Sequence, residues 1–142
     1  MYKDQINIGI IGSGHISDFH IEVIKYIKNV NLCSIYSKTL NNAKKKSIKH
    51  KIGFFTDNLD LFIKKYQYDG LLVIVSADKI YSITSKILKF KIPLLIEKPV
   101  GLSIKELKDL IKINKKFNTP NLIGLNRRHY SSFKKVHSLL QG

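Results

Sequence analysis

Residues 6–17 read Ile6-Asn-Ile-Gly-Ile-Ile-Gly12-Ser-Gly14-His-Ile-Ser17. An apolar run enters a glycine turn, and the apolar residues after it repeat at helical spacing, namely Ile16, Phe19, Val23, Ile24 and Ile27. The stretch therefore predicts a strand, a tight turn and a helix. In that setting Gly12 permits the turn, and Gly14 leaves room for a pyrophosphate beside the N–H groups at the helix start. We interpret the stretch as a dinucleotide-binding turn.

The third small position of this turn is Ser17, where the usual fingerprint has glycine or alanine. Serine is the next smallest side chain, so close packing of the helix on the strand stays possible. The alternative is a glycine-rich turn between a strand and a helix that binds nothing, since short glycine patterns also occur without a ligand.

The composition predicts one globular domain. The chain has 142 residues, 44% of them hydrophobic and only three prolines, which suits a single folded domain with a real core. Charge-free runs such as residues 70–77 are too short to cross a bilayer. The single cysteine, Cys33, lies in an apolar strand pattern and cannot form an internal disulfide. We therefore expect a reduced, cytoplasmic protein without a membrane segment.

The net charge of +15 invites a nucleic-acid interpretation, which we discount. Lysine supplies 23 of the 25 basic residues, with 22 isoleucines and ten asparagines, a profile that looks like the drift of an AT-rich genome. Surfaces that read nucleic acids favour arginine, whose planar fork matches phosphates and bases. We expect the lysines at 44–46 and 115–116 to form solvated helix faces, while the overall charge attracts anionic ligands such as dinucleotides.

Apolar strand patterns alternate with helical patterns along the whole chain. We expect strands at residues 6–11, 31–36, 53–55, 70–76, 93–97 and 121–125. We expect helices at residues 15–29, 40–50, 59–66, 79–91, 104–117 and 132–140, with Ser103 and Glu106 as a capping box. Six strands separated by helices imply a parallel sheet covered on both faces, with the apolar run 71–75 at its centre. The predicted fold is a doubly wound α/β domain, a Rossmann fold.

In a doubly wound sheet the ligand lies beyond the carboxyl ends of the strands. Short, mostly polar segments directly follow the predicted strands, and this rule selects them as the candidate site. They are Gly12, Ser13, Gly14, His15 and Ile16; Ser37 and Lys38; Ser76 and Ala77; Glu97 and Lys98; and Asn126, Arg127 and Arg128.

The end of the second predicted strand bears on the choice of cofactor. An acidic residue there would accept from the ribose 2′-hydroxyl and repel a 2′-phosphate, but the chain has Ser37 and Lys38. A hydroxyl followed by a cation suits a 2′-phosphate, which favours NADP(H) over NAD(H). The alternative is that Lys38 is one more surface lysine in a lysine-rich chain.

The segment Glu97-Lys98-Pro99 is the second strong feature. A residue before proline is pushed towards extended geometry, so Lys98 is held at the strand end. Its ammonium could donate to a substrate hydroxyl and steady the alkoxide that forms as hydride leaves. Glu97 could pair with Lys98 or orient it. The alternative is an ordinary salt bridge at a strand end.

Three motifs occur in order: a glycine turn followed by a histidine (Gly12, Gly14, His20), then Glu97-Lys98-Pro99, then Asn126-Arg127-Arg128. Together they resemble the N-terminal half of the glucose-fructose oxidoreductase / inositol dehydrogenase (Gfo/Idh/MocA) family. The resemblance covers essentially the whole chain. It implies an NAD(P)-dependent oxidoreductase of sugar metabolism that passes hydride between the nicotinamide and a sugar or polyol, with Lys98 near the reacting hydroxyl.

The sequence departs from the family pattern in three places. Ser17 replaces the third glycine. After the fourth strand, Tyr81 stands near the place of the family's histidine, and the preceding proline is missing. Members also continue into a second α/β domain that supplies substrate contacts, a catalytic His or Asp and usually the oligomer interface. This chain stops where that domain would begin, so we expect residues 1–142 to be a single cofactor domain, with His129 and His137 as poor catalytic substitutes.

The leading hypothesis is thus the cofactor-binding domain of a sugar or polyol oxidoreductase, inactive alone. The second is a non-enzymatic nucleotide-binding or subunit-interaction module completed by another chain, with oligomers possible. The third, a basic nucleic-acid binder, rests on net charge alone.

Overall fold

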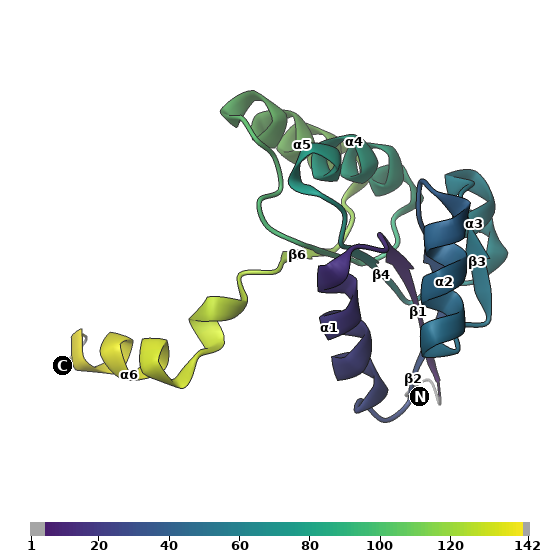
Figure 1. The fold of residues 1–142 in the computed structure, drawn as a ribbon. Coiled ribbons are helices and arrows are strands. Elements are labelled where there is room, and N and C mark those ends of the chain that lie inside the picture. The colour runs from purple at the N-terminus through teal and green to yellow at the C-terminus, as the bar shows by residue number, and fades with distance from the viewer. Residues whose placement is uncertain (1–4, 141–142) are drawn as a thin grey trace.

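The computed structural model describes residues 5–140. Its strands are β1 (Ile6–Ile11), β2 (Val30–Tyr36), β3 (Phe54–Thr56), β4 (Gly70–Val73), β5 (Leu94–Ile96) and β6 (Asn121–Ile123). Its helices are α1 (His15–Lys25), α2 (Leu40–His50), α3 (Leu59–Lys65), α4 (Ala77–Ile87), α5 (Ile104–Phe117) and α6 (Ser131–Leu140), with 3-10 helices η1 (Leu88–Phe90) and η2 (Asn126–His129). The strands form one parallel sheet in the order β3-β2-β1-β4-β5-β6. The predicted doubly wound α/β fold is confirmed (Figure 1).

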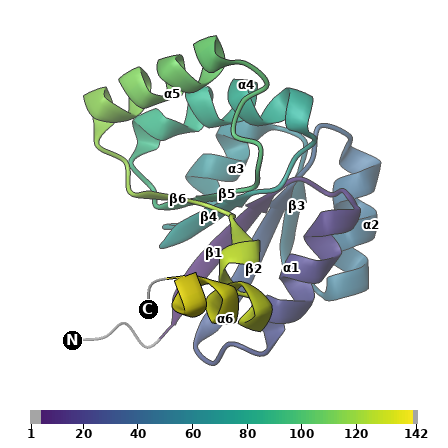
Figure 2. The same ribbon diagram turned by 90° about the vertical axis from the view of Figure 1, so that its left-hand side faces the viewer.

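The sheet has a separate apolar core on each face, because alternate strand residues point to opposite sides. Ile10 packs with Ile21 and Ile24 of α1 on one face. Its neighbour Ile11 packs on the other face with residues of α3, α4 and α5. Figure 2 shows these helices on the two sides of the sheet. The central strand β4 contributes to both cores and is buried over its last three residues, as its apolar run predicts.

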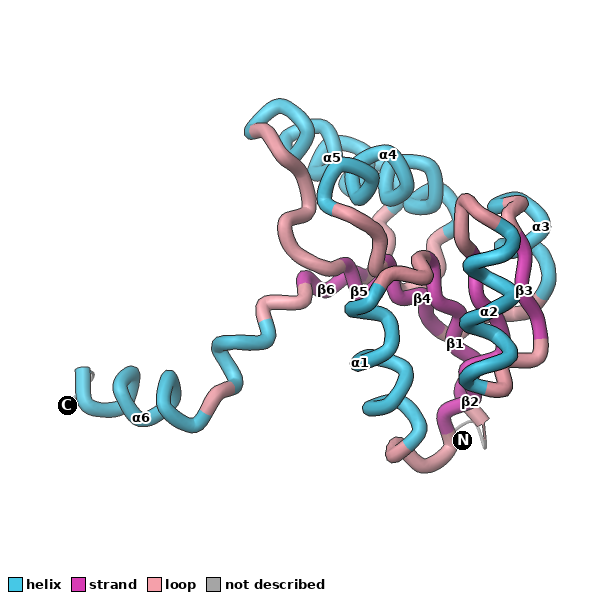
Figure 3. Tube along the Cα trace, viewed as in Figure 1, coloured by secondary structure: helices cyan, strands magenta, loops and turns pink. Residues whose placement is uncertain are grey.

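The strand order places a switch point between β1 and β4. From β1 the chain runs outward to β2 and β3, then crosses back to β4 and runs outward to β5 and β6 (Figure 3). Connections therefore leave the carboxyl ends of β1 and β4 in opposite directions, and a crevice opens between them. This crevice is where a ligand is expected.

The predicted helix after the glycine turn forms, but it is shorter than expected. Helix α1 ends at Lys25 and not at Asn29, which has a left-handed φ of 66°. Ile21 and Ile24 face the core, whereas Phe19 and Val23 are 60% and 62% exposed. The helix carries two apolar stripes, and the pattern of residues did not show which of them the sheet covers.

The largest of the other differences from the predicted boundaries are those of β4 and α4. Strand β4 stops at Val73, so Ser76 is the N-cap of α4, which begins at Ala77 and gives way to the 3-10 turn η1. The capping box at α5 forms in half: the Ser103 hydroxyl accepts from the Glu106 N–H at 3.1 Å. The Glu106 carboxylate accepts instead from the N–H of Leu102 at 2.7 Å.

Helix α6 follows β6 and η2 and projects away from the sheet (Figure 1). All its residues are exposed, among them Phe133, Val136, Leu139 and Leu140. Within residues 5–140, no helix has the length and apolar character needed to traverse a bilayer.

Candidate functional site

A cleft of about 1310 Å³ opens at the carboxyl edge of the sheet, with side chains of α1 and α4 among its walls. It collects nearly all the candidate residues predicted from the sequence. Those that line it are Gly12, Ser13, Gly14, His15, Ile16, Ser37, Lys38, Ser76, Glu97, Lys98, Asn126 and Arg127. Ala77 and Arg128 are not among its lining residues; they lie in α4 and η2.

The two glycines of the turn meet different surroundings. Gly12 has φ of +122°, and a Cβ there would lie 2.0 Å from the carbonyl oxygen of Ile74. The turn therefore needs glycine at this position for the fold itself. Gly14 has φ of −68°, and a Cβ there would meet no atom within 4 Å. The space beside Gly14 is open to the cleft.

The start of α1 can accept an anion. Gly14 is its N-cap and offers no side-chain cap, and the first N–H groups of a helix have no partner within the helix. Ser17 is fully buried, and its hydroxyl donates to the carbonyl oxygen of Gly14 at 2.6 Å. Serine at the third small position thus packs closely and adds a hydrogen bond that braces the turn.

The end of β2 is joined to the glycine turn. The Ser13 hydroxyl donates to that of Ser37 at 2.7 Å. Ser37 is buried, while Lys38 is exposed at the cleft wall. A smaller hollow of about 240 Å³ adjoins the cleft, and it is lined by Ser13, Asn42, Lys45, Lys46 and Lys49.

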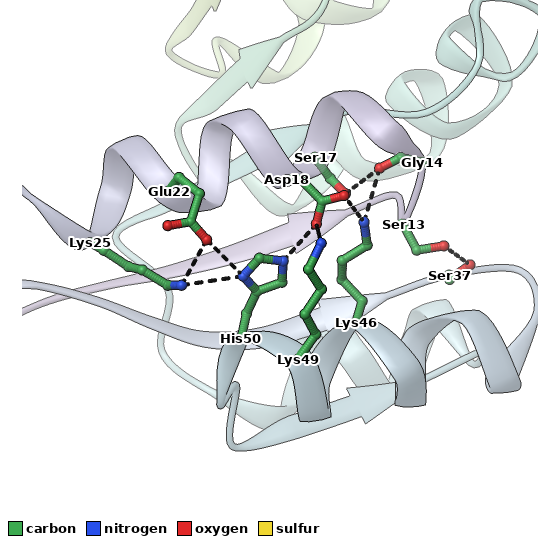
Figure 4. A network of polar contacts seen from close by, with 10 residues as sticks. All are labelled: Ser13, Gly14, Ser17, Asp18, Glu22, Lys25, Ser37, Lys46, Lys49 and His50. Carbon is green, nitrogen blue, oxygen red and sulfur yellow. Dashed lines mark hydrogen bonds and ion pairs between the residues drawn. The ribbon is translucent and has the colours of Figure 1, made fainter.

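Behind the turn, a polar network ties α1 to α2 (Figure 4). Asp18 pairs with Lys46 at 2.8 Å, with Lys49 at 3.2 Å and with the buried His50 at 2.6 Å. Lys46 also donates to the carbonyl oxygen of Gly14 at 3.3 Å. The hydrogen bond from Lys46, with those from His50 and Lys49, holds the pKa of the Asp18 carboxyl well below its usual range. Lys46 is therefore half-buried in an ion pair, unlike the solvated lysine expected from the sequence.

Glu97 has a partner that the sequence did not indicate. Its carboxylate oxygen Oε1 lies 2.9 Å from Nε2 of His20, and Oε2 accepts from the backbone N–H of Lys98 at 3.1 Å. Within residues 5–140 the Lys98 ammonium has no hydrogen bond or ion pair. Glu97 thus holds the backbone of Lys98, and the Lys98 ammonium stays available at the cleft.

The loop after β4 differs from its expected arrangement. Ser76 donates to Asp78, which lowers the pKa of the Asp78 carboxyl together with a bond from Lys79. Tyr81 turns away from the cleft and donates to Asp109 of α5 at 2.7 Å, a bond that raises the Tyr81 pKa. Tyr81 therefore does not supply a cleft group in place of the family's histidine.

Several cleft residues were not selected from the sequence as site residues. They lie on the walls and not at strand ends: Phe19 and Val23 on α1, Asn42 on α2, Lys79, Ser82, Ile83 and Lys86 on α4, and Tyr130 after η2. The signal that could have found them is their helical spacing. Helix α1 has two apolar stripes, and the stripe that the sheet does not cover faces the cleft. His129 and His137 are exposed and do not line the cleft.

Comparison with known proteins identifies this arrangement. Residues 6–123 match the model of an oxidoreductase family with an NAD-binding Rossmann fold, GFO_IDH_MocA. The chain belongs to the Gfo/Idh/MocA family. The predicted resemblance is confirmed, and the Gfo/Idh/MocA chain is an NAD(P)-binding oxidoreductase domain.

Relatives of this Gfo/Idh/MocA chain include two curated bacterial proteins. It is 27% identical over 139 residues to the myo-inositol 2-dehydrogenase of Thermotoga maritima, covering 96% of the chain and 41% of that protein. It is 23% identical over 137 residues to the uncharacterized oxidoreductase YrbE of Bacillus subtilis, covering 96% and 40%. The chain therefore spans about 40% of the length of these relatives.

The fold is shared with the solved structure of scyllo-inositol dehydrogenase from Lactobacillus casei, which contains bound NAD(H) and scyllo-inositol. The TM-score is 0.86 at 18% identity, over 96% of this chain and 41% of that one. At 18% identity, this comparison shows a shared Rossmann fold and nothing beyond the fold.

Proposed function

We propose that this chain is the cofactor-binding part of an oxidoreductase that transfers hydride between a nicotinamide dinucleotide and a hydroxyl or carbonyl of a sugar or polyol. The observation that carries the proposal is the single cleft that brings the glycine turn and the free Lys98 ammonium together. Its inositol dehydrogenase relative supports the substrate class.

The residues present fit a dinucleotide. The cleft exceeds the roughly 1,000 Å³ of a large small-molecule pocket, as an extended cofactor requires. Gly12, Ser13, Gly14, His15 and Ile16 would contact the pyrophosphate, since the open space at Gly14 lies at the start of α1. Ser37 and Lys38 would hold the adenosine ribose. Ser76 would border the nicotinamide ribose, with Glu97, Asn126 and Arg127 completing the contacts, whereas Ala77, which does not line the cleft, would not take part.

Bound nicotinamide would supply the site that gives or takes the hydride. Lys98 would donate a hydrogen bond to the substrate oxygen and stabilise its negative charge as hydride leaves the carbinol carbon. Its ammonium suits this role because nothing within residues 5–140 engages it. A version of the protein that includes the second domain of its relatives tests the role: Lys98→Ala should lower kcat at least about a hundredfold. Unchanged turnover would exclude it.

We also propose that NADP(H) is favoured over NAD(H). No acidic side chain follows β2, and Ser37 and Lys38 stand where the ribose is read. The hollow beside Ser13 adds support, because its side chains from α2 include three lysines. One of them, Lys45, is exposed and has no ion pair within residues 5–140.

A titration with NADPH and NADH, followed by nicotinamide fluorescence, tests both parts of the proposal. We expect saturable binding of both cofactors, with NADPH tighter. Lys45→Ala should weaken NADPH about fivefold and leave NADH unchanged, whereas Lys44→Ala, on the same helix but outside the hollow, is the matched control. Binding of neither cofactor would overturn the function, and equal binding of both would overturn the preference alone.

A second candidate function is a nucleotide-binding or subunit-interaction module completed by another chain. The exposed apolar side chains of α6 favour it, because bare apolar patches mark surfaces that a partner covers. Static light scattering with and without NADPH tests it. Self-association that Phe133→Glu abolishes would support an oligomer, and a monomer at all concentrations would exclude self-assembly through α6.

A cytoplasmic location and a place in sugar metabolism complete the proposal. The single cysteine, Cys33, can form no internal disulfide, and this sparing use of cysteine supports a reducing compartment.

A further inference from the structure

The cleft residue His20 is not a strand-end residue, yet it contacts the centre of the candidate site. It lies on α1, one turn beyond the segment that faces the pyrophosphate, and its Nε2 atom is 2.9 Å from Glu97 Oε1. The His20 and Glu97 side chains are 26% and 17% exposed. A charge-assisted bond in such a shielded place is stronger than one on an open surface.

The peptide group that joins Ile96 to Glu97 is held from both sides of β5. Its N–H donates to the carbonyl oxygen of Val73 at 3.0 Å, and the N–H of Gly124 donates to Ile96 at 2.8 Å. Glu97 therefore cannot move without breaking bonds that extend the sheet.

Both oxygens of the Glu97 carboxylate have a hydrogen-bond partner. One oxygen faces His20, and the other accepts from the backbone N–H of Lys98. A Cβ on Gly124 would lie 3.4 Å from Oε1, so the loop after β6 closes over the carboxylate without touching it. With His20 removed, this carboxylate would lose the partner that keeps its second oxygen aimed at Lys98.

We propose that His20 is a positioning residue that places Lys98 through Glu97. The chain of contacts runs from α1 through two carboxylate oxygens to the backbone of Lys98, whose own ammonium is free. His20 lies on α1, and the N-terminal end of this helix would bind the pyrophosphate. The contact between His20 and Glu97 thereby sets the distance between the bound pyrophosphate and the Lys98 ammonium. The role of Lys98 rests on the proposed function, whereas the contact chain does not.

The test observes Lys98 directly in the complete 142-residue chain. Reductive methylation with ¹³C labels every lysine, and the Lys98→Arg variant identifies the Lys98 resonance by its loss. We expect His20→Ala to move that resonance by more than its line width. His20→Gln, whose amide can donate to Glu97, should restore the resonance. His129→Ala removes an exposed imidazole outside the cleft and should leave it unmoved.

If His20 had only a structural role, His20→Ala would lower the melting temperature but would not shift the Lys98 resonance more than those of the other lysines. An unmoved Lys98 resonance in folded His20→Ala would overturn the proposal, as would failure of His20→Gln to restore it. If His20→Ala does not fold, Glu97→Ala serves instead, because it removes both carboxylate oxygens, the one that faces His20 and the one that accepts from Lys98, and it should move the same resonance. NADPH titration of the unsubstituted chain tests the proposed function separately. If NADPH does not bind but His20→Ala still shifts the Lys98 resonance, the proposed function fails and the positioning role of His20 stands.

Discussion

Helix α1 and the turn before it have one side against the sheet and α2, and another side over the cleft. On the first side lie Gly12, the buried Ile21 and the ion pairs of Asp18. On the second lie Gly14 and the exposed Phe19, with open space beside them. The two sides use similar residue types, a glycine and a large apolar residue each. What distinguishes them is whether the protein itself fills the space that they face.

Gly12→Ala should have the largest effect on stability. The new Cβ would meet the Ile74 carbonyl at 2.0 Å on a backbone with positive φ, so strain and overpacking add. We expect the free energy of unfolding to fall by about 3 kcal/mol or more. Urea denaturation followed by circular dichroism measures it. A loss below about 1 kcal/mol would show that the turn relaxes and that Gly12 does not serve the fold.

Ile21→Ala, compared with Phe19→Ala, tests the two sides of the helix directly. Ile21 is 1% exposed and its removal leaves a cavity, whereas Phe19 is 60% exposed. We expect losses of about 3 kcal/mol for Ile21→Ala and about 0.5 kcal/mol for Phe19→Ala in the same denaturation experiment. Equal losses would mean that the side of α1 that faces the cleft is also packed in solution, and the difference between the two sides of the helix would not hold.

Asp18→Asn should cost about 1 kcal/mol at neutral pH, because it removes the charge that Lys46, His50 and Lys49 share. The Asp18 pKa is lower in the folded state than in the unfolded state. The stabilisation is therefore present above the unfolded value of about 3.9 and is lost as pH falls below it. The gap between the melting temperatures of the two proteins should therefore be constant from pH 7 to about pH 5 and should narrow as the pH falls from there to 3. A gap that stays constant down to pH 3 would assign the loss to packing instead.

Gly14→Ala should have the smallest effect on stability. Its φ of −68° suits alanine and a Cβ meets nothing, so we expect only a few tenths of a kcal/mol, the usual cost at an N-cap. NADPH affinity should nevertheless fall about tenfold, because the Cβ occupies the space meant for the pyrophosphate. Unimpaired binding would show that the cofactor does not approach Gly14.

The sequence was sufficient for the fold and for the strand-end residues of the site. In a parallel sheet, the turns that follow the carboxyl ends of the strands all lie at the same edge. Ser37, Glu97 and Arg127 could therefore be assigned to one site without knowing any distance. The walls of the cleft could not be predicted in the same way. Which stripe of α1 is buried depends on how the helix is rotated over the sheet, and both stripes are apolar.

The sequence also could not predict which charged residues form ion pairs with one another. Glu97 meets His20 across the cleft, and Asp18 meets Lys46 and His50 between helices. Such pairs join residues far apart in the chain, and a chain with 23 lysines offers many equivalent candidates. Only the three-dimensional arrangement selects among them.

The switch point between β1 and β4 has a consequence for how the molecule assembles during synthesis. A ribosome releases the glycine turn first, and Glu97, Lys98 and Arg127 of the opposite wall emerge later. A nascent chain that has formed β1, β2 and β3 has half of the cleft. A ligand that contacts both halves would therefore stabilise the six-stranded sheet over every partly assembled one.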